Sequence, residues 1–360
     1  MDRPHDVAHA LVRAASALMP TPPPSSLSVP HQGVETSVDT ARTSACATRH
    51  RIAVVGAGQF GQNHCRVIRQ STRAELTAVV DIDPSRAAIA DYFADYRELT
   101  GKVDAAIVAT PTSAHAEIGC WLLEHGIDVL MEKPIAPDLE SADRLIAAAA
   151  RHGRILQVGH LERFNPAVIA LEERVTLPLF FEIHRLSVFS PRSLDVDVIL
   201  DLMIHDIDIV LSLTRAEPDE IRGAGVSILS PKVDIANVRL QFPNGCVANL
   251  TASRVSTERV RKLRLFQPQQ YCSLDYARQE LIVFSVGGDR QVSCEPVPVA
   301  KSEPLQLQLD AFLDSVETRN SPKTSGLAAR QTLRIALSIL DNIKEHSEIV
   351  SQSLVSGWKL

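Results

Sequence analysis

The chain has 360 residues and a formal net charge of −6, with 45% hydrophobic and 22% charged residues. This length leaves room for two domains and a large core. The acidic balance argues against nucleic acid or an anionic membrane as the main partner. No stretch contains the ~18 uninterrupted apolar residues that a membrane span needs. The six cysteines are scattered without metal-binding spacing, so we expect no metal site and reduced thiols in the cytoplasm.

Residues 1–50 differ from the rest of the chain. A short helical pattern at residues 6–18 is ended by prolines, and the polar sequence that follows has neither helical nor strand periodicity. No continuous apolar segment precedes a cleavage-like site, so a signal peptide fits poorly. We expect a disordered extension, with the folded protein beginning near His50.

A dinucleotide-binding turn is predicted near the start of the folded region. An apolar strand at 52–55 runs into Gly56-x-Gly58-x-x-Gly61, and a helical pattern follows at 62–70. Gly56 allows the tight turn and Gly58 lets the backbone approach a pyrophosphate. Gly61 lets the helix pack closely on the strand. The strand before the glycines and the helix after them make this motif more specific than three glycines alone.

Other residues near this turn are also predicted to bind the cofactor. Gln59 and Phe60 lie in the turn itself, and the first N–H groups of the helix that follows would face the phosphates, whose charge the helix dipole favours. Asp81 ends the next strand, where its carboxylate can accept both ribose hydroxyls and would repel a 2′-phosphate. Arg86 could instead bind that phosphate. We therefore expect NAD, with NADP as the less favoured alternative.

Strands and helices alternate from residue 51 to residue 165, which predicts a Rossmann domain with a doubly wound parallel sheet. The expected strands are 52–55, 76–80, 103–109, 128–131 and 155–158, and the expected helices are 62–70, a helix opening at Asp83, 113–125 and 139–152. Ligands bind such sheets at the carboxyl ends of the strands. The remaining predicted cofactor contacts lie at this edge: Thr110, Pro111, His115, Glu132 and Lys133. His64 and His115 stand early in helices and could alternatively cap or pack.

From residue 166 to residue 350 the pattern predicts a C-terminal α+β domain with a large, mostly antiparallel open sheet. The expected strands are 179–186, 222–229, 235–242, 247–253, 260–266 and 280–284, and the expected helices are 166–174, 196–213, 304–317 and 326–346. The sequence Pro243-Asn244-Gly245 between two of the strands is typical of a hairpin turn.

Three residues are candidates for catalysis. Lys133 follows a strand at the ligand-binding edge, where its charge can orient a substrate hydroxyl and lower the pKa of that hydroxyl. Asp201 and His205 are four residues apart and share one helix face. Histidine is the side chain best suited to accept a hydroxyl proton near neutral pH. A surface lysine and a helix-stabilising Asp–His pair are the plain alternatives, and no third ligand is spaced for a metal.

Several further side chains could bind substrate. His160 and Arg163 follow the last strand of the parallel sheet and would face the cleft. Four arginines on or beside predicted strands could pair with a phosphorylated substrate: Arg185, Arg192, Arg254 and Arg261. Each of these alone can equally be a solvated surface charge.

Taken together, these motifs resemble the Gfo/Idh/MocA family of oxidoreductases from about residue 51 to residue 346. The matching stretches are Val-Val-Gly-Ala-Gly-Gln-Phe-Gly at 54–61, Ala-Thr-Pro-Thr-Ser-Ala-His at 109–115, Val-Leu-Met-Glu-Lys-Pro at 129–134, and the Asp201-x-x-x-His205 helix. The resemblance implies catalysis by Lys133, Asp201 and His205, with hydride transfer between nicotinamide and a sugar or polyol carbon. It also implies a homo-oligomer, a dimer or tetramer, built through the open sheet.

One departure from the common family pattern narrows the resemblance. Many members have a glycine-rich entry to the Asp-x-x-x-His helix, whereas this chain has Asp195-Val-Asp197-Val-Ile-Leu. This variant, with the sequences at 159–166 and 252–264, resembles the group that oxidises the 3-hydroxyl of UDP-N-acetylglucosamine to a ketone for lipid A synthesis. The open alternatives are another sugar or polyol dehydrogenase or reductase of the family, a redox-assisted glycosidase that retains NAD, and a non-catalytic NAD sensor.

Overall fold

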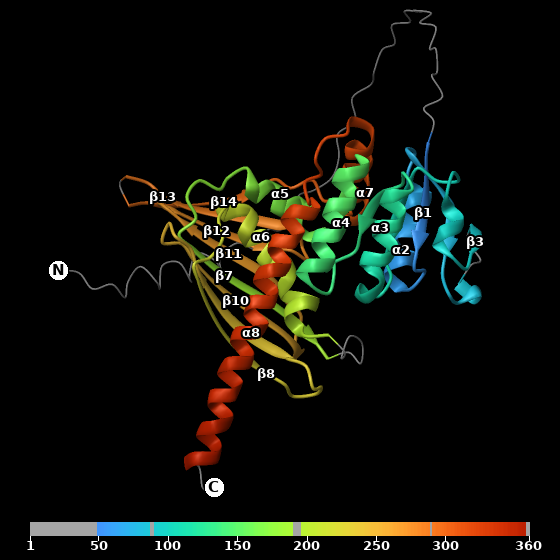
Figure 1. The fold of residues 1–360 in the computed structure, drawn as a ribbon. Helices are drawn as coiled ribbons and strands as arrows, with labels where there is room; N and C mark the ends of the chain where they lie inside the picture. The colour runs from blue at the N-terminus through green and yellow to red at the C-terminus, as the bar shows by residue number, and fades with distance from the viewer. Residues whose placement is uncertain (1–48, 87–89, 190–195, 289, 358–360) are drawn as a thin grey trace, which may run out of the picture. The chain divides into compact units, whose positions relative to one another are not determined.

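The computed structural model describes residues 49–86, 90–189, 196–288 and 290–357 (Figure 1), with side chains described as far as residue 348. The extension predicted for residues 1–50 therefore lies almost wholly outside the described residues. Every helix among the described residues is too short or too polar to cross a bilayer.

The first sheet has six parallel strands in the order β3-β2-β1-β4-β5-β6. Their bounds are β1 His50–Val55, β2 Ala74–Val80, β3 Asp91–Phe93, β4 Ala105–Val108, β5 Asp128–Met131 and β6 Leu156–Val158. The connecting helices are α2 Gln59–Gln70, α3 His115–Glu124 and α4 Leu139–His152. This is the doubly wound sheet predicted from the alternating pattern.

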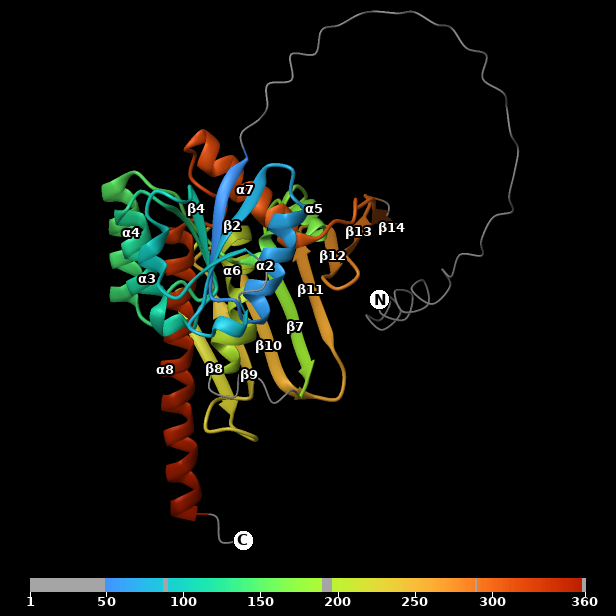
Figure 2. The ribbon, with the colours of Figure 1, turned by 90° about the vertical axis from the view of Figure 1, so that its right-hand side faces the viewer.

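Both faces of this sheet are buried. Ile52 and Val54 of β1 belong to one apolar cluster, and Ala53 and Val55 belong to the other, because successive strand residues point to opposite faces. Figure 2 shows α2 and α7 (Pro304–Thr318) on one face, with α3 and α4 on the other. The first turns of α8 (Gly326–Gly357) add Ala329 to the cluster beneath α3 and α4. The chain thus returns to the first sheet near its end, and the division at residue 165 stays a prediction.

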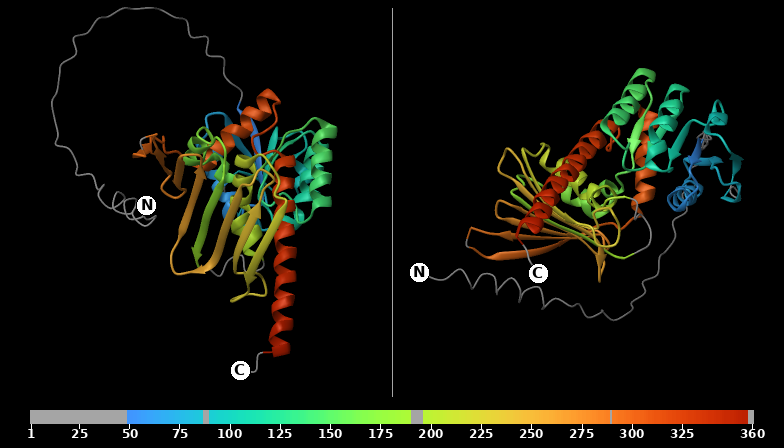
Figure 3. Two further views of the ribbon diagram at one scale, coloured as in Figure 1. Left: turned by 90° about the vertical axis from the view of Figure 1, so that its left-hand side faces the viewer. Right: turned by 60° about the horizontal axis from the view of Figure 1, so that its bottom comes forward.

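The second sheet has eight strands in the order β14-β13-β12-β11-β7-β10-β9-β8, and every neighbouring pair is antiparallel except β7 with β10. The bounds are β7 Phe180–Val188, β8 Glu220–Val226, β9 Ile235–Gln241, β10 Val247–Ser256, β11 Val260–Gln267, β12 Gln270–Asp275, β13 Glu280–Val286 and β14 Val292–Val297. Figure 3 shows these strands side by side as one open sheet. The predicted fold class is confirmed for both sheets.

Helices cover one face of the second sheet, here called its inner face. They are α5 (Pro166–Glu172), α6 (Ile204–Thr214) and part of α8, which runs from α4 past α6 to β8 (Figure 1). Their apolar side chains pack with alternate residues of the strands, such as Phe181 and Ile183 of β7. A π-helical turn, Ile199–Met203, immediately precedes α6.

Some elements differ from their predictions for local reasons. The helix expected after Asp83 is, in the described residues, only a 3₁₀ turn at Pro84–Arg86, whose start Asp83 fixes by accepting hydrogen bonds from Ser85. Strands β3, β12 and β14 were not predicted. Strand β14 contains Pro296, and as an edge strand it tolerates the missing N–H donor.

Candidate active site

The glycine turn at the carboxyl end of β1 is closed too tightly to admit side chains at two positions. Gly56 has a φ of +91°, and a Cβ atom there would lie 2.7 Å from the carbonyl oxygen of Ala109. At Gly61 a Cβ atom would lie only 1.8 Å from the carbonyl oxygen of Gly56. Because both positions lack a side chain, the start of α2 can lie close against β1, as the motif predicts.

A cavity of about 780 Å³ opens at this edge of the first sheet. The predicted cofactor residues that line it are Gly56, Gly58, Asp81, Arg86, Thr110 and Pro111. Gly58 begins α2 without a side-chain cap, and the nearest atom to a Cβ built there is 3.6 Å away, on Arg86. Open space and uncapped helical N–H groups together fit the pyrophosphate of a dinucleotide.

Asp81 is fixed in place at the end of β2. Its Oδ2 accepts a hydrogen bond from the Ala57 N–H at 2.6 Å, and its Oδ1 accepts one from the Asp83 N–H at 2.9 Å. Each oxygen keeps a second lone pair for a ribose hydroxyl. Arg86 donates to Asp83 at 3.2 Å and stands at the same cavity. Asp81 and Arg86 therefore both lie at the cavity, as predicted, and their contact with a cofactor stays a prediction.

His115 and Glu132 support the cavity from behind. The His115 ring nitrogens lie 2.9 Å from the Pro134 carbonyl oxygen and 3.0 Å from that of Thr110, so the ring ties the ends of β4 and β5 together. Burial lowers the pKa of His115, which favours the neutral ring. Glu132 lies 2.8 Å from His64 Nε2. Burial raises the pKa of Glu132, but the hydrogen bond and the charge of His64 outweigh burial and bring this pKa below its usual value.

Lys133, Asp201 and His205 come together where α6 meets the ligand-binding edge of the first sheet. Lys133 Nζ donates to the main-chain oxygen of Asp201 at 2.6 Å and lies 3.3 Å from Asp201 Oδ1. Asp201 lies in the π-helical turn, a distortion that often marks functional positions. Nδ1 of His205 is buried and has no hydrogen-bond partner among the described residues. Burial, followed by the charges of Lys133 and Arg185, holds the His205 pKa well below its usual range.

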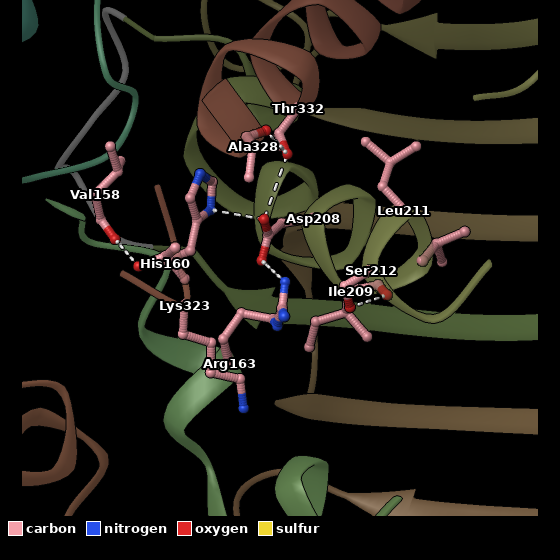
Figure 4. Close-up of polar contacts among 12 residues, drawn as sticks. Val158, His160, Arg163, Asp208, Ile209, Leu211, Ser212, Lys323, Ala328 and Thr332 are labelled. Atoms are coloured by element: carbon pink, nitrogen blue, oxygen red, sulfur yellow. Dashed lines mark hydrogen bonds and ion pairs between the residues drawn. The ribbon is translucent and has the colours of Figure 1, made fainter. Parts of the chain in front are cut away.

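His160 and Arg163 gather around Asp208 of α6 (Figure 4). His160 Nδ1 lies 4.0 Å from Asp208 Oδ1, and Arg163 Nη1 lies 3.7 Å from Asp208 Oδ2. Thr332 of α8 hydrogen bonds to Asp208 at 3.4 Å, and Arg163 also donates to Glu172 at 3.1 Å. The cluster connects the segment after β6 to α6 and α8. Its two predicted substrate residues thus lie near the candidate centre, and their contact with substrate stays a prediction.

Arg185 is enclosed by carboxylates. It donates to both oxygens of Asp206, at 2.8 and 2.7 Å, and to Glu162 Oε1 at 2.9 Å, while its side chain is only 2% exposed. Tyr276 lies under it, with 5.0 Å from the guanidinium carbon to the ring centroid. This geometry favours a structural role and does not support direct contact with substrate. Sequence reasoning missed Asp206 and Glu162, although a charged residue at an inner-face strand position signals a buried partner.

The remaining predicted arginines differ in position. Arg254 is buried and donates to the carbonyl oxygens of Val196 and Val233, so it anchors the segment that leads into the π-helical turn. Arg192 lies outside the described residues. Arg261 of β11 faces the same side of the second sheet as Arg185 and contributes to lowering the His205 pKa.

Comparison with known proteins identifies the family. Residues 50–160 match an oxidoreductase family with an NAD-binding Rossmann fold, and residues 184–267 match the C-terminal domain of the same Gfo/Idh/MocA group. The chain belongs to the Gfo/Idh/MocA family. It is an NAD(P)-dependent oxidoreductase that acts on CH–OH groups, as the motifs predicted.

Two curated relatives and two solved structures show how similar this Gfo/Idh/MocA protein is to known proteins. UDP-N-acetylglucosamine 3-dehydrogenase from Acidithiobacillus ferrooxidans is 36% identical over 80% of this chain and 96% of its own. A structure of that enzyme matches with a TM-score of 0.79 at 35% identity, covering 83% and 99% of the two chains. Inositol 2-dehydrogenase from an Arthrobacter species is 33% identical over 46% of this chain and 55% of its own. An Agrobacterium radiobacter oxidoreductase, solved with NAD⁺, L-tartaric acid and magnesium, shares the fold with a TM-score of 0.72 at 18% identity, covering 82% and 97% of the two chains.

Proposed function

We propose that this protein is an NAD-dependent dehydrogenase that oxidises the 3-hydroxyl of UDP-N-acetylglucosamine to the 3-keto sugar, a step toward lipid A precursors. The single observation that supports this choice of substrate is the 36% identity to UDP-N-acetylglucosamine 3-dehydrogenase over 96% of that enzyme's length. The arrangement of Lys133, Asp201 and His205 beside the cofactor cavity supports the reaction type.

The chain's own residues are placed to manage the hydroxyl proton. When bound, NAD supplies the hydride acceptor of the reaction. His205 accepts the proton: its pKa is held low, so the ring is neutral near pH 7, and its Nδ1 has no competing partner among the described residues. Lys133 Nζ, held by two oxygens of Asp201, orients the hydroxyl and stabilises the negative charge that develops on its oxygen.

NAD is proposed over NADP because of Asp81. Its carboxylate is fixed by the N–H groups of Ala57 and Asp83 at the cavity, where it would accept ribose hydroxyls and repel a 2′-phosphate. Arg86, the residue that could favour NADP, is already paired with Asp83. Comparison of kcat/KM for the two cofactors measures this preference directly.

A homo-oligomer through the outer face of the second sheet is also part of the proposal. Aromatic rings form a continuous row across neighbouring strands on that face: Phe180, Phe266, Tyr271 and Phe284. Such a row is typical of a surface that another chain covers.

The test uses purified protein with NAD and UDP-N-acetylglucosamine, followed by the absorbance of NADH. We expect turnover, and His205→Gln and Lys133→Met should each lower kcat by at least about 10²-fold. NAD binding measured by protein fluorescence should stay unchanged in His205→Gln, which separates lost chemistry from lost cofactor. Absence of turnover with any UDP-sugar would remove the substrate, and unaltered rates in the two variants would remove the mechanism.

A further inference from the structure

Two arginines stand directly opposite each other on the inner face of the second sheet. In the antiparallel register of β7 and β11, Arg261 is the cross-strand partner of Arg185. The neighbouring inner-face positions are apolar and fully buried, as Leu263 and Leu265 show. Like charges directly opposite each other destabilise a sheet pair. Two cations at this position therefore call for an explanation.

Arg185 is hydrogen bonded to two carboxylates, whereas Arg261 only lies near one of them. Arg185 makes two hydrogen bonds to Asp206 and one to Glu162 Oε1 at 2.9 Å. Arg261 forms an ion pair with the same Glu162 oxygen, but its Nη1 is 3.9 Å away and Arg185 holds that oxygen more closely. Nε of Arg261 is buried and has no hydrogen-bond partner among the described residues. A buried donor without an acceptor is costly, so the site lacks an anion.

An outside ligand can reach Arg261. Its side chain is 35% exposed, compared with 2% for Arg185. It also lies close to His205: Glu162 pairs with both arginines, and Arg185 hydrogen bonds to Asp206, the residue that follows His205. A substrate whose hydroxyl approaches His205 would thus place its other polar groups within range of Arg261.

We propose that Arg261 binds the diphosphate of the nucleotide-sugar substrate and sets the specificity of the site for phosphorylated sugars. This inference rests on the proposed function. A guanidinium presents several N–H donors in a fixed plane that matches phosphate oxygens, and a diphosphate would supply close acceptors to the exposed part of the Arg261 guanidinium. The pyrophosphate of NAD is a separate ligand, since its predicted place is the glycine turn at the start of α2.

The test compares the wild-type protein with Arg261→Gln. We expect the KM for UDP-N-acetylglucosamine to rise by about 10- to 100-fold, the loss expected for a hydrogen-bonded charge pair. The KM for NAD should not change, and kcat should change by less than about 3-fold, because the proton acceptor and Lys133 remain in place. Calorimetry with UDP on the NAD-loaded protein should show the same factor in Kd, independently of turnover.

Arg264→Gln is the matched control. Arg264 lies on the same strand but on the opposite face of the sheet, where it donates to Glu182 at 2.8 Å. Its substitution should leave both KM values and the UDP Kd at the wild-type level. The fold also provides a check, because removing Arg261 relieves repulsion with Arg185. The melting midpoint of Arg261→Gln should equal or exceed that of the wild type.

The outcomes separate this inference from the proposed function. If the wild type turns over UDP-N-acetylglucosamine and Arg261→Gln keeps the wild-type KM and UDP Kd, the role of Arg261 is overturned while the function stands. If no UDP-sugar is turned over but UDP binds and Arg261→Gln weakens it, Arg261 is supported and the substrate is wrong. If the NAD-loaded wild type binds no UDP, the assignment of Arg261 is overturned.

Discussion

Two polar regions of the molecule are built in different ways. At the glycine turn the contacts come mainly from main-chain groups and from glycines with no room for a side chain, around a cavity of about 780 Å³. On the inner face of the second sheet the polar atoms belong to charged side chains, and Arg185 with Asp206 is almost fully buried. The first region is therefore defined by backbone shape and the second by charge balance.

This difference predicts which substitutions damage each region. An added methyl group should disturb the glycine turn, whereas removal of a charge there should matter less. On the inner face the reverse holds, because each buried charge relies on its partner for the solvation that it has lost. The predictions below test this contrast, beginning with the largest expected loss.

Replacing Arg185 by Met should be the most destabilising of these changes. The variant leaves Asp206 and Glu162 without their main counter-charge in a buried setting. Breaking a buried ion pair on one side typically costs about 3–5 kcal/mol. Urea unfolding should show a loss of this size in the free energy of unfolding, or the variant should fail to accumulate as folded protein.

A second substitution makes this first prediction specific. Arg185→Met combined with Asp206→Leu removes both charges of the closest pair, and should recover part of the lost stability because Asp206 is no longer buried without a partner. A loss below about 1 kcal/mol for Arg185→Met, or a double variant less stable than the single one, would contradict charge balance as the organising feature.

Gly61→Ala tests the glycine turn. The new Cβ would lie 1.8 Å from the carbonyl oxygen of Gly56, so α2 must move away from β1. Overpacking of this kind typically costs about 1–3 kcal/mol, and the displaced helix should bind NAD more weakly. Thermal unfolding and fluorescence titration with NAD measure the two effects.

Gly58→Ala is the control for that experiment. Gly58 has φ −64° and ψ −169°, which alanine adopts readily, and the nearest atom to its Cβ is 3.6 Å away. Stability should therefore stay near the wild type while NAD binding weakens, because the methyl group occupies the approach of the pyrophosphate. Equal stability losses in the two variants would show that backbone shape does not distinguish these positions.

The two regions also differ in how much the sequence predicts. Some patterns are local, because residues close together in the sequence define them. The glycine turn, Asp81 and the strand end before Lys133 are of this kind, and they contributed to the predicted fold class and family. The pairing of Arg185 with Asp206 joins a strand to a helix 21 residues away, and Glu162 joins from another segment. No periodicity predicts such a contact. It depends on the register of β7 with β11 and on how α6 packs across them.

Missed elements have equally physical reasons. Strand β3 has only three residues, too few to show alternation, and β14 contains a proline that only an edge strand accommodates. The role of Arg261 was undecided from the sequence because a charged strand residue reads the same on either face. Arg261 differs from Arg264 in its cross-strand partner, which is Arg185 for Arg261 and Glu182 for Arg264.

The smallest expected effect is the pH dependence that His205 gives to stability. Its pKa is lowered in the folded protein, mainly by burial, from an ordinary value near 6.5. The unfolded chain therefore binds the proton more readily, and the free energy of unfolding should fall as the pH drops below about 6.5. His205→Gln removes this term. Its stability should decline less steeply with acid, by at most about 1.4 kcal/mol per pH unit, in urea unfolding series between about pH 5 and 7.5.

The pH slope of the unfolding free energy must be compared between the wild type and His205→Gln. His160 and His115 also have pKa values lowered by burial, and they remain in both proteins. A His205→Gln slope as steep as the wild type would mean that the ring titrates equally in both states. The neutral His205 assigned as proton acceptor would then lose its basis, since neither burial nor the charges of Lys133 and Arg185 would be acting on it. A shallower slope would support a ring that burial and these two charges keep neutral in the folded protein.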